Sequence, residues 1–441
     1  MKEYLFQVNN WWTTGNIPSE YQDTIPREKT REIERFIDDR EILTLIGPRR
    51  SGKTTIIYQL IDSLLQSGTN PKNVLYISLD DPEITLDMGD DLFIRLFESY
   101  QEIILRELKK GKIYIFIDEI QYFKGWEMWL KKYFDQYSNI KFIVSGSSSL
   151  AIKDESAALT GRNLRFLIYP FSYREFIRAK DNILIEKTVF SYENFEDAYN
   201  AALPVKNKLV LLFQEYLHCG GYPRTVNEDA GKSREILKQY FYDTIYKDVL
   251  KMYSVKDVRA LESIAAYLAQ NIGNRFSFRK ISSALGIDVD TVIRYVRYLE
   301  ETYLVFMVNY FSYSSKAVMQ KEKKVYMIDT GLRNAISTSA DEPVLVENCV
   351  FTHLIRKFEN VSYWRDIEEV DFVVSIDNAL LPVEVKYQNS IGQSDIKSVL
   401  KFCKRFKLNK GVIVTKNDLK RKIINGIEVW FIPVWLFIAV I

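Results

Sequence analysis

The chain has 441 residues, enough for two to four domains with sizeable apolar cores. Its 60 Lys and Arg residues nearly balance 58 Asp and Glu residues, so the net charge of +2 excludes a global polyanion-attracting field, and any basic surface must be local. Three scattered cysteines and two histidines argue against a disulfide framework, a zinc site and a histidine-based catalytic triad, and the adjacent His218 and Cys219 are expected to be structural.

The first strong signal is a phosphate-binding loop. Residues 42–46 form an apolar, β-prone run, and residues 47–54 read Gly-Pro-Arg-Arg-Ser-Gly-Lys-Thr, which fits G-x-x-x-x-G-K-[ST]. Apolar residues then follow at helical spacing over 55–65. A strand, a glycine loop and a helix together aim a helix N-terminus at a phosphate. The residues expected to bind ATP are Gly47, Pro48, Arg49, Arg50, Ser51, Gly52, Lys53, Thr54 and Thr55.

The next signals supply what ATP hydrolysis requires. The run 112–117 predicts a buried strand that ends in Asp118-Glu119. We expect Asp118 and the Thr54 hydroxyl to hold Mg²⁺, and Glu119 to polarise the attacking water. Lys53 is expected to reach the β- and γ-phosphates and assist catalysis. Another strand, 74–79, is expected to lie between the loop strand and the Asp118 strand.

A third predicted strand, 140–144, ends in a run of small hydroxyl residues, 145–149. Ser147 is the candidate that senses the γ-phosphate or orients the water, although the run also fits a plain turn. Arg162 is a candidate arginine finger, acting in its own subunit or in a neighbour. It is equally consistent with an ordinary surface arginine.

The middle third predicts a helix over 235–252 and then a helix-turn-helix over 276–303, with Gly286 at the turn. Two β-prone runs, 304–308 and 324–328, could form a wing. Arg294, Arg297 and Tyr298 are expected to face outward from the second helix. DNA contact is one hypothesis, and protein–protein packing is the other, because neighbouring acidic residues offset the arginines.

In the C-terminal third, Glu347 is expected to open a helix that runs to about residue 358, followed by strands at 362–365, 369–374 and 381–386. Glu384 and Lys386 are two residues apart and share one face of their strand. Asp371 is expected opposite them, and Glu347 could add a carboxylate. Such a set can bind Mg²⁺ for phosphodiester cleavage, with Lys386 catalytic, but it also fits a solvated surface ion pair.

The chain ends in an apolar run over 429–441. It has 13 residues and contains Pro433, so it is too short to span a bilayer and suits a last core strand. The first residues lack the apolar segment of a secretory signal. We therefore expect a cytoplasmic protein with no membrane partner.

Motifs in order along most of the chain resemble a prokaryotic, often archaeal, family of P-loop ATPases. That family joins an AAA+-like ATPase, a winged helix and a C-terminal domain similar to PD-(D/E)xK nucleases. The matching segments are 47–55, 116–121, 169–176, 220–223, 329–332, 347–348, 369–372 and 382–386.

The resemblance implies an α/β fold in several parts. These are an ASCE-type parallel-sheet ATPase domain (1–175, with an N-terminal extension 1–30), a helical domain (176–255), a winged helix (256–335) and a restriction-endonuclease-like domain (336–441). It also implies that Glu347, Asp371, Glu384 and Lys386 form a nuclease-like metal site. The turn 220–223 resembles the hinge of STAND ATPases, in which nucleotide state changes domain packing.

Two functions therefore remain open, besides a weaker option of nucleotide binding without hydrolysis, against which the intact Glu119 argues. One is a Mg²⁺-dependent ATPase that acts on DNA and controls the nuclease-like module. The other is an ATP-gated switch that binds a protein partner or another copy of itself, with a silent nuclease fold.

Overall fold

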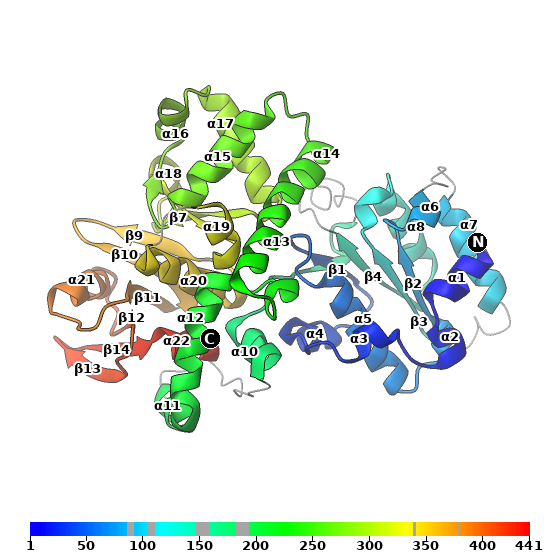
Figure 1. Ribbon diagram of the computed structural model, residues 1–441, viewed down its shortest axis with the longest axis horizontal. Coiled ribbons are helices and arrows are strands. Elements are labelled where there is room, and N and C mark those ends of the chain that lie inside the picture. The colour runs from blue at the N-terminus through cyan, green and yellow to red at the C-terminus, as the bar shows by residue number, and fades with distance from the viewer. Residues whose placement is uncertain (86–91, 105–110, 147–158, 182–193, 338–340, 377–378) are drawn as a thin grey trace. The chain divides into compact units, whose positions relative to one another are not determined.

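The computed structural model describes residues 1–85, 92–104, 111–146, 159–181, 194–337, 341–376 and 379–441 (Figure 1). The chain divides into two compact units, Met1–Tyr169 and Pro170–Ile441. The first unit thus ends slightly before the expected boundary at residue 175. The finer boundaries expected after residues 255 and 335 both fall inside the second unit, so they stay predictions.

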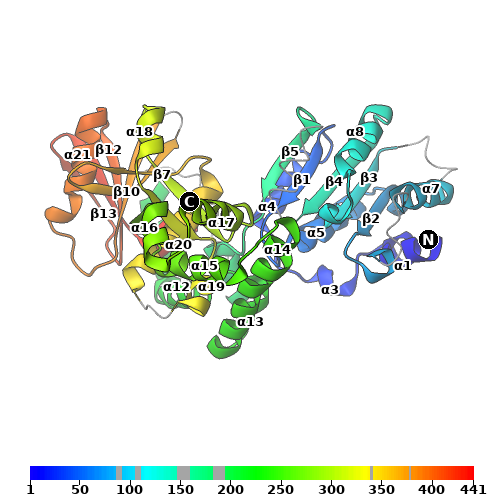
Figure 2. The ribbon, with the colours of Figure 1, turned by 90° about the horizontal axis from the view of Figure 1, so that it is seen from above.

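The first unit contains a parallel sheet whose described strands lie in the order β2-β3-β4-β1-β5 (Figure 2). The prediction that the strand near residue 74 lies between the loop strand and the Asp118 strand is wrong, because β4 takes that place and β2 is at the edge. The carboxyl end of β4 therefore lies between the phosphate loop and the acidic pair. The strands are β1 (Ile42–Ile46), β2 (Val74–Ser78), β3 (Ile113–Asp118), β4 (Ile140–Gly146) and β5 (Asn163–Leu167).

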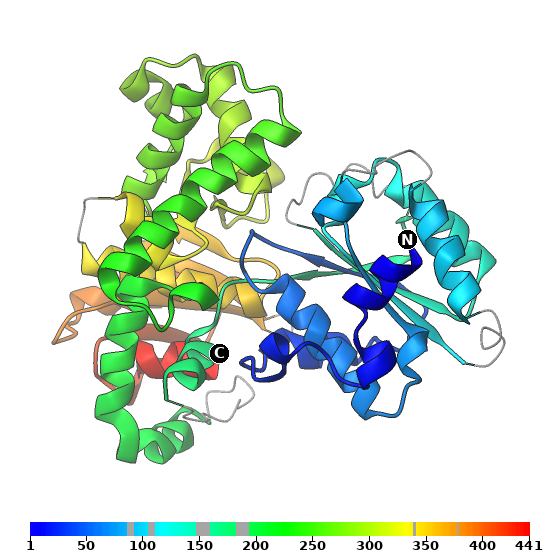
Figure 3. The same cartoon turned by 45° about the vertical axis from the view of Figure 1, so that its right-hand side comes forward.

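The chain's first residues explain how β2 can be an edge strand. The Asn9 side chain donates to the carbonyl oxygen of Tyr76 (3.0 Å) and accepts from its N–H (2.6 Å). The indole N–H groups of Trp11 and Trp12 both donate to the carbonyl of Val74. The N-terminal segment thus satisfies backbone groups that an edge strand would otherwise expose. Figure 3 shows these dark blue helices beside the sheet; they are α1 (Lys2–Val8), α2 (Trp11–Thr14), α3 (Ser19–Gln22) and α4 (Glu28–Glu34).

Helices cover both faces of this sheet (Figure 2). On one face, Phe97 of α7 contacts Trp129 and Tyr133 of α8, with ring centroids 5.9 and 4.6 Å apart. On the other face, α5 packs against the N-terminal helices, and Tyr58 stacks on Tyr21 at 3.9 Å. Connections between parallel strands are right-handed, and the connection from β1 to β2 crosses the sheet in the opposite direction to the one from β3 to β4. The helices of these two connections must therefore lie on opposite faces. The helices are α5 (Lys53–Gln66), α6 (Pro82–Thr85), α7 (Leu92–Ile104) and α8 (Trp126–Gln136).

The second unit contains one mixed sheet, whose described strands lie in the order β13-β14-β12-β11-β10-β9-β7-β8-β6. The parallel pairing of β7 with β9, through Asn309 and Ser362, joins the strands of the middle third to those of the C-terminal third. The strands predicted before residue 400 are present with differences only at their ends; they are those at 304–308, 324–328, 362–365, 369–374 and 381–386. The described strands of this sheet are β6 (Arg275–Phe276), β7 (Val305–Tyr310), β8 (Lys323–Met327), β9 (Ser362–Arg365), β10 (Glu369–Ile376), β11 (Ala379–Lys386), β12 (Lys410–Thr415), β13 (Lys420–Ile424) and β14 (Ile427–Pro433).

Alternation along β14 separates the two faces of the C-terminal part of this sheet. Phe431 packs in a core with Val399 of α21, whereas Trp430 contacts Phe195, which also stacks on Phe437 of α22. The helices of this unit are α10 (Tyr173–Asp181), α11 (Asn194–Ala202), α12 (Lys206–Cys219), α13 (Ala230–Asp243), α14 (Leu250–Met252), α15 (Val258–Gln270), α16 (Phe278–Leu285), α17 (Val289–Glu301), α18 (Ser315–Gln320), α19 (Thr330–Ile336), α20 (Glu342–Lys357), α21 (Lys397–Phe406) and α22 (Val434–Val440).

Two sequence predictions change here. Glu347 lies within α20 rather than opening it. The apolar run at the end of the chain is a strand only as far as Pro433, after which it forms α22, because proline has no N–H for the ladder and its φ of −57° suits a helix start. Among the described residues, no helix is both long and apolar enough to cross a bilayer.

Candidate functional site

The loop between β1 and α5 has the backbone that its glycines predict. Gly47 and Gly52 have φ angles of 149° and 97°, which side chains rarely adopt. A Cβ at Gly47 would also lie 2.3 Å from the carbonyl oxygen of Ile168. Lys53 is only 4% exposed, and its Nζ donates to the carbonyls of Gly47 and Pro48 at 3.0 and 2.9 Å. The loop thus holds a buried ammonium group at the N-terminus of α5.

The N-terminal segment braces this loop through Arg27, a residue that sequence reasoning missed. Its buried guanidinium donates to the carbonyl of Ser51 (2.7 Å) and to that of Tyr169 (2.7 Å). Its backbone N–H donates to Gln59 on α5 (3.1 Å). Nothing in the polar run around residue 27 distinguishes it from a surface arginine, so only the tertiary structure identifies it.

The acidic pair lies beside the loop at the carboxyl edge of the sheet. Asp118 is 2% exposed, and its Oδ2 accepts hydrogen bonds from the Thr54 hydroxyl (2.6 Å) and the Tyr76 hydroxyl (3.3 Å). Its Oδ1 accepts from the Ser145 hydroxyl. Burial, and then the Glu119 charge, raises the pKa of Asp118, while the bonds from Ser145 and Thr54 oppose the shift.

Glu119 adopts a left-handed conformation, with φ of 54°. Its N–H donates to Asp118 Oδ1 (3.1 Å) and to Ser145 Oγ (3.2 Å), and the Gln121 amide donates to its carboxylate. Ser145 therefore links both acidic residues. Its place could not be seen in the sequence, because it depends on β4 lying between β1 and β3.

The other two catalytic candidates of this unit do not join the group. Ser147 lies outside the described residues. Arg162 precedes β5, and its carbonyl accepts from Ile42 at the start of β1, so it lies at the amino edge of the sheet, opposite the phosphate loop. Its guanidinium pairs with Asp135 (3.1 Å). A finger role within the same subunit is therefore wrong for this geometry.

The residues present fit a nucleoside triphosphate with Mg²⁺. The loop offers backbone N–H groups at a helix N-terminus and the buried Lys53 ammonium, and Thr54 and Asp118 offer oxygen ligands to a hard cation. Within the described residues, the buried Ser51 hydroxyl has no hydrogen-bond partner, which is a further group that a phosphate could satisfy.

The second unit brings a group of carboxylates together, as predicted. The Asp371 N–H donates to Glu384 (3.3 Å), and Asp371 accepts from the Val385 N–H (3.0 Å). Glu384 also pairs with Lys386 at 2.6 Å. Glu347 reaches the group from α20 through Lys324, which contacts both Glu347 and Asp371.

The metal role predicted for these residues does not fit. The Lys324 side chain, 2% exposed, places Nζ 3.0 Å from Glu347, 2.8 Å from Glu369 and 3.1 Å from Asp371. An ammonium group therefore occupies the point on which Glu347, Glu369 and Asp371 converge. Among the described residues, no group of three His, Cys, Asp or Glu side chains is arranged to hold a metal ion.

Lys324 was missed although the sequence carries a signal for it. Lys324 and Tyr326 are two apart in β8 and share a face, and the Tyr326 hydroxyl also donates to Glu347 (2.6 Å). Burial opposes the charge of Lys324, but Glu347 and the other acidic neighbours raise its pKa well above the usual value. Burial, and then the Asp371 charge, raises the pKa values of Glu347 and Glu384.

The candidate DNA-reading helix, α17, is less available than expected. Tyr298 is only half-exposed, and its ring stacks on that of Tyr253, with the two ring centroids 3.8 Å apart. Arg297 pairs with Glu301 at 2.7 Å. Arg294 is exposed as predicted, and its guanidinium donates to Thr291 on the same helix.

Comparison with known families agrees with this geometry for the first unit. Residues 39–177 match the model of an AAA domain, and residues 210–342 and 344–437 match two domains of unknown function. The first unit is a P-loop ATPase-like α/β domain of the AAA type.

The chain is also similar to proteins along most of its length. An uncharacterized protein of Haemophilus influenzae is 27% identical over 417 residues, which cover 92% of this chain and 96% of that protein. An uncharacterized protein of Methanocaldococcus jannaschii is 28% identical over 402 residues, covering 88% and 85%. The solved structure of a Walker-type ATPase of Pyrococcus abyssi aligns with a TM-score of 0.45 at 17% identity, covering 71% of this chain and 96% of that one.

Proposed function

We propose that the protein binds ATP with Mg²⁺ and hydrolyses the ATP, and that hydrolysis controls a DNA-binding second unit. The observation that carries the ATPase proposal is the hydrogen-bonded junction of Thr54 and Asp118 (2.6 Å), with Ser145, beside the buried Lys53. A loop hydroxyl and a strand-end carboxylate in contact are the oxygen ligands that P-loop NTPases use for Mg²⁺.

Each residue has a role that follows from its chemistry. Lys53 neutralises the β- and γ-phosphates, and the loop amides hold them. Thr54 and Asp118 hold Mg²⁺, which when bound offsets phosphate charge. Glu119 accepts a hydrogen bond from the attacking water and aligns it. Ser145 fixes the acidic pair relative to the loop.

Two substitutions test this proposal. Lys53→Ala should abolish detectable binding of a fluorescent ATP analogue, because it removes the ammonium that faces the phosphates. Glu119→Gln should bind the analogue normally and lose about 100-fold or more in phosphate release, since positioned acid–base groups contribute about 10²–10⁴-fold. Asp80→Asn, a carboxylate next to β2, is the matched control and should turn over normally. Retained turnover in Lys53→Ala would refute the assignment.

For the second unit, we propose the four-domain division expected from the sequence. Helices α15–α17 with strands β6–β8 have the order of helices and strands of a winged helix, which supports that part. The convergence of Glu347, Asp371, Glu384 and Lys386 supports a PD-(D/E)xK-like fold for the last part.

The DNA partner is best supported by charge in α21, β12 and β13. Residues 397–422 contain ten Lys or Arg residues and one acidic residue, Asp418. This excess of nine positive charges lies in a chain of net charge +2, so the remainder of the chain carries −7. Most of these basic side chains are exposed or half-buried on the surface. A segment with this excess of basic side chains, in a chain that is otherwise acidic, favours a polyanion.

Binding of duplex DNA, followed by fluorescence anisotropy over a salt series, tests this surface. The double variant Lys404→Glu/Lys407→Glu should bind at least about tenfold more weakly at 0.1 M salt and show a smaller salt slope. Lys238→Glu/Lys316→Glu, the same charge change on exposed lysines elsewhere, is the control. If Arg294→Glu alone weakens binding, α17 and not this surface reads the DNA.

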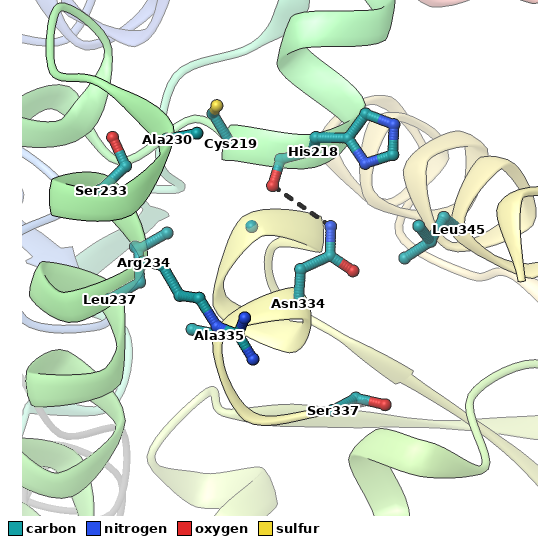
Figure 4. Close-up of a pocket in the computed structure, with 11 residues that line it drawn as sticks. His218, Cys219, Ala230, Ser233, Arg234, Leu237, Asn334, Ala335, Ser337 and Leu345 are labelled. Carbon is teal, nitrogen blue, oxygen red and sulfur yellow. Dashed lines mark hydrogen bonds between the residues drawn. The ribbon is translucent and has the colours of Figure 1, made fainter. Parts of the chain in front are cut away.

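A second candidate, the ATP-gated switch, is favoured by the turn at 220–223. The Asp329 carboxylate accepts from the N–H groups of Gly221 (2.7 Å) and Leu332 (2.8 Å), tying the turn to α19. A cavity of about 320 Å³ lies beside it, lined by α12, α13 and α19, where Asn334 donates to the carbonyl of His218 at 3.2 Å (Figure 4). An open pocket beside the glycine turn leaves room for these helices to shift.

Solution scattering tests the switch directly. The Glu119→Gln variant with ATP should differ in its scattering profile from the same variant with ADP. Coinciding profiles would eliminate this candidate and leave the DNA proposal untouched.

A further inference from the structure

The carboxylate cluster of the second unit already contains its own cation. The Lys324 ammonium has three N–H donors and lies about 3 Å from an oxygen of each of three carboxylates, Glu347, Glu369 and Asp371. Its side chain is almost completely buried. The number of donors matches the number of acceptors, so the ammonium is fully satisfied where it lies.

A Mg²⁺ ion would need the same space and the same oxygens. It binds oxygen ligands at about 2.0–2.1 Å in an octahedron, which is closer than the oxygens of an ammonium pair. It would also have to lie beside a positive charge that water does not screen. Lys324 and a divalent cation therefore exclude one another at this cluster.

The predicted metal ligands also have hydrogen-bond partners other than Lys324. Glu384 pairs with Lys386 and accepts from the backbone of Asp371 (3.3 Å), while Asp371 accepts from the backbone of Val385 (3.0 Å). The Tyr326 hydroxyl donates to Glu347. Each carboxylate predicted as a metal ligand thus has partners from the chain itself.

The cluster joins secondary-structure elements that are far apart in the sequence. Lys324 belongs to β8, in the part of the sheet with β6 and β7, whereas Glu347 is on α20 and Asp371 is on β10. These residues are 23 and 47 positions away from Lys324 along the chain. The ion pairs therefore fasten the middle strands to the C-terminal strands at the point where a nuclease of this fold would hold its metal.

We infer that the Lys324 ammonium replaces the divalent cation of the nuclease-like site, so that the cluster is a charge clamp between β8, α20 and β10 and not a hydrolytic metal centre. The inference concerns the C-terminal fold proposed above, but it does not depend on ATP hydrolysis. It makes the second unit a DNA-binding part that does not cut.

Titration of the nucleotide-free full-length protein with Mn²⁺, followed by electron paramagnetic resonance, tests the inference. Wild-type protein and Asp371→Asn should bind the same amount of Mn²⁺, because the cluster contributes no site in either. Lys324→Ala should gain one Mn²⁺ site at the cluster, with an affinity at least about tenfold higher than that of any weak Mn²⁺ binding there in the wild type. The gained site should disappear in Lys324→Ala/Asp371→Asn.

Lys386→Ala is the matched control, because it removes the other ammonium of the cluster and leaves Lys324 in place; it should gain no site. Circular dichroism checks folding, and Lys324→Gln, which keeps a side-chain donor without the charge, serves if the alanine variant does not fold. Wild-type Mn²⁺ binding that is lost in Asp371→Asn would overturn the inference. So would a folded Lys324 variant that gains no site. ATP turnover is measured separately, so failure of the ATPase proposal would be recognised on its own.

Discussion

Replacing Ser145 by alanine tests whether the third strand end takes part in ATP hydrolysis. The Ser145 hydroxyl donates to Asp118 and accepts from the Glu119 N–H at 3.2 Å, so it is the one side chain of β4 that contacts both acidic residues among those the structure describes. The substitution removes these two contacts without changing the loop, Lys53 or Thr54.

The expected size follows from the charge of the acceptor. A hydrogen bond to a charged group contributes about 1.5–3 kcal/mol. If losing this hydrogen bond displaces Glu119 and raises the barrier to hydrolysis by the same amount, the turnover number should fall by about 10–150-fold. Nucleotide affinity should change by less than about threefold, because the groups that face the phosphates remain in place.

Phosphate release at saturating ATP gives the turnover number, and titration of a fluorescent analogue gives the affinity. Thr44→Val is the control, because it removes a buried hydroxyl of the same sheet that bonds to Asn163 (2.7 Å) and not to the acidic pair. That variant should lose stability but keep its turnover. A Ser145→Ala turnover within twofold of wild type, or a loss of affinity with unchanged turnover, would refute the reasoning.

Three further predictions concern single residues. Burial lowers the pKa of His353 from 6.5 to about 3, so its neutral form stabilises the fold above pH 6.5, and that contribution is lost as the pH falls toward 3. Between pH 7 and 5, the wild type should therefore lose about 2 kcal/mol more unfolding free energy, measured in urea, than His353→Gln. Parallel pH profiles of the two proteins would contradict this. Gly220→Ala, whose Cβ would lie 2.0 Å from the Asp329 carboxylate, should lower the free energy of unfolding in urea by more than about 2 kcal/mol. Gly286→Ala, at a φ of 68° with open space around it, should lower it by only about 1 kcal/mol. Equal losses in the two variants would argue against the close contact at Gly220. Arg162→Ala should leave ATP turnover within twofold at concentrations where sedimentation shows single copies, because the residue lies at the amino edge of the sheet; a large loss under those conditions would place it at the site.

Local patterns determined much of the fold. The run 47–54 and the pair Asp118-Glu119 could be recognised directly, because the backbone geometry and the chemistry of each site come from adjacent residues. The helix-turn-helix at 276–303 and the strands around Asp371 and Glu384 were also predicted correctly in type, because burial sets a period of 3.6 or 2 along the chain.

The sequence by itself therefore determined that the chain carries a phosphate loop with its acidic partner, and that carboxylates gather in its last third. Only the tertiary structure decided which strand separates β1 from β3, and hence that Ser145 of β4 contacts Asp118. It also decided that Lys324 fills the carboxylate cluster. The reason is physical: periodicity records which side of an element is buried, whereas the identity of a buried group's partner depends on contacts between residues far apart in the chain.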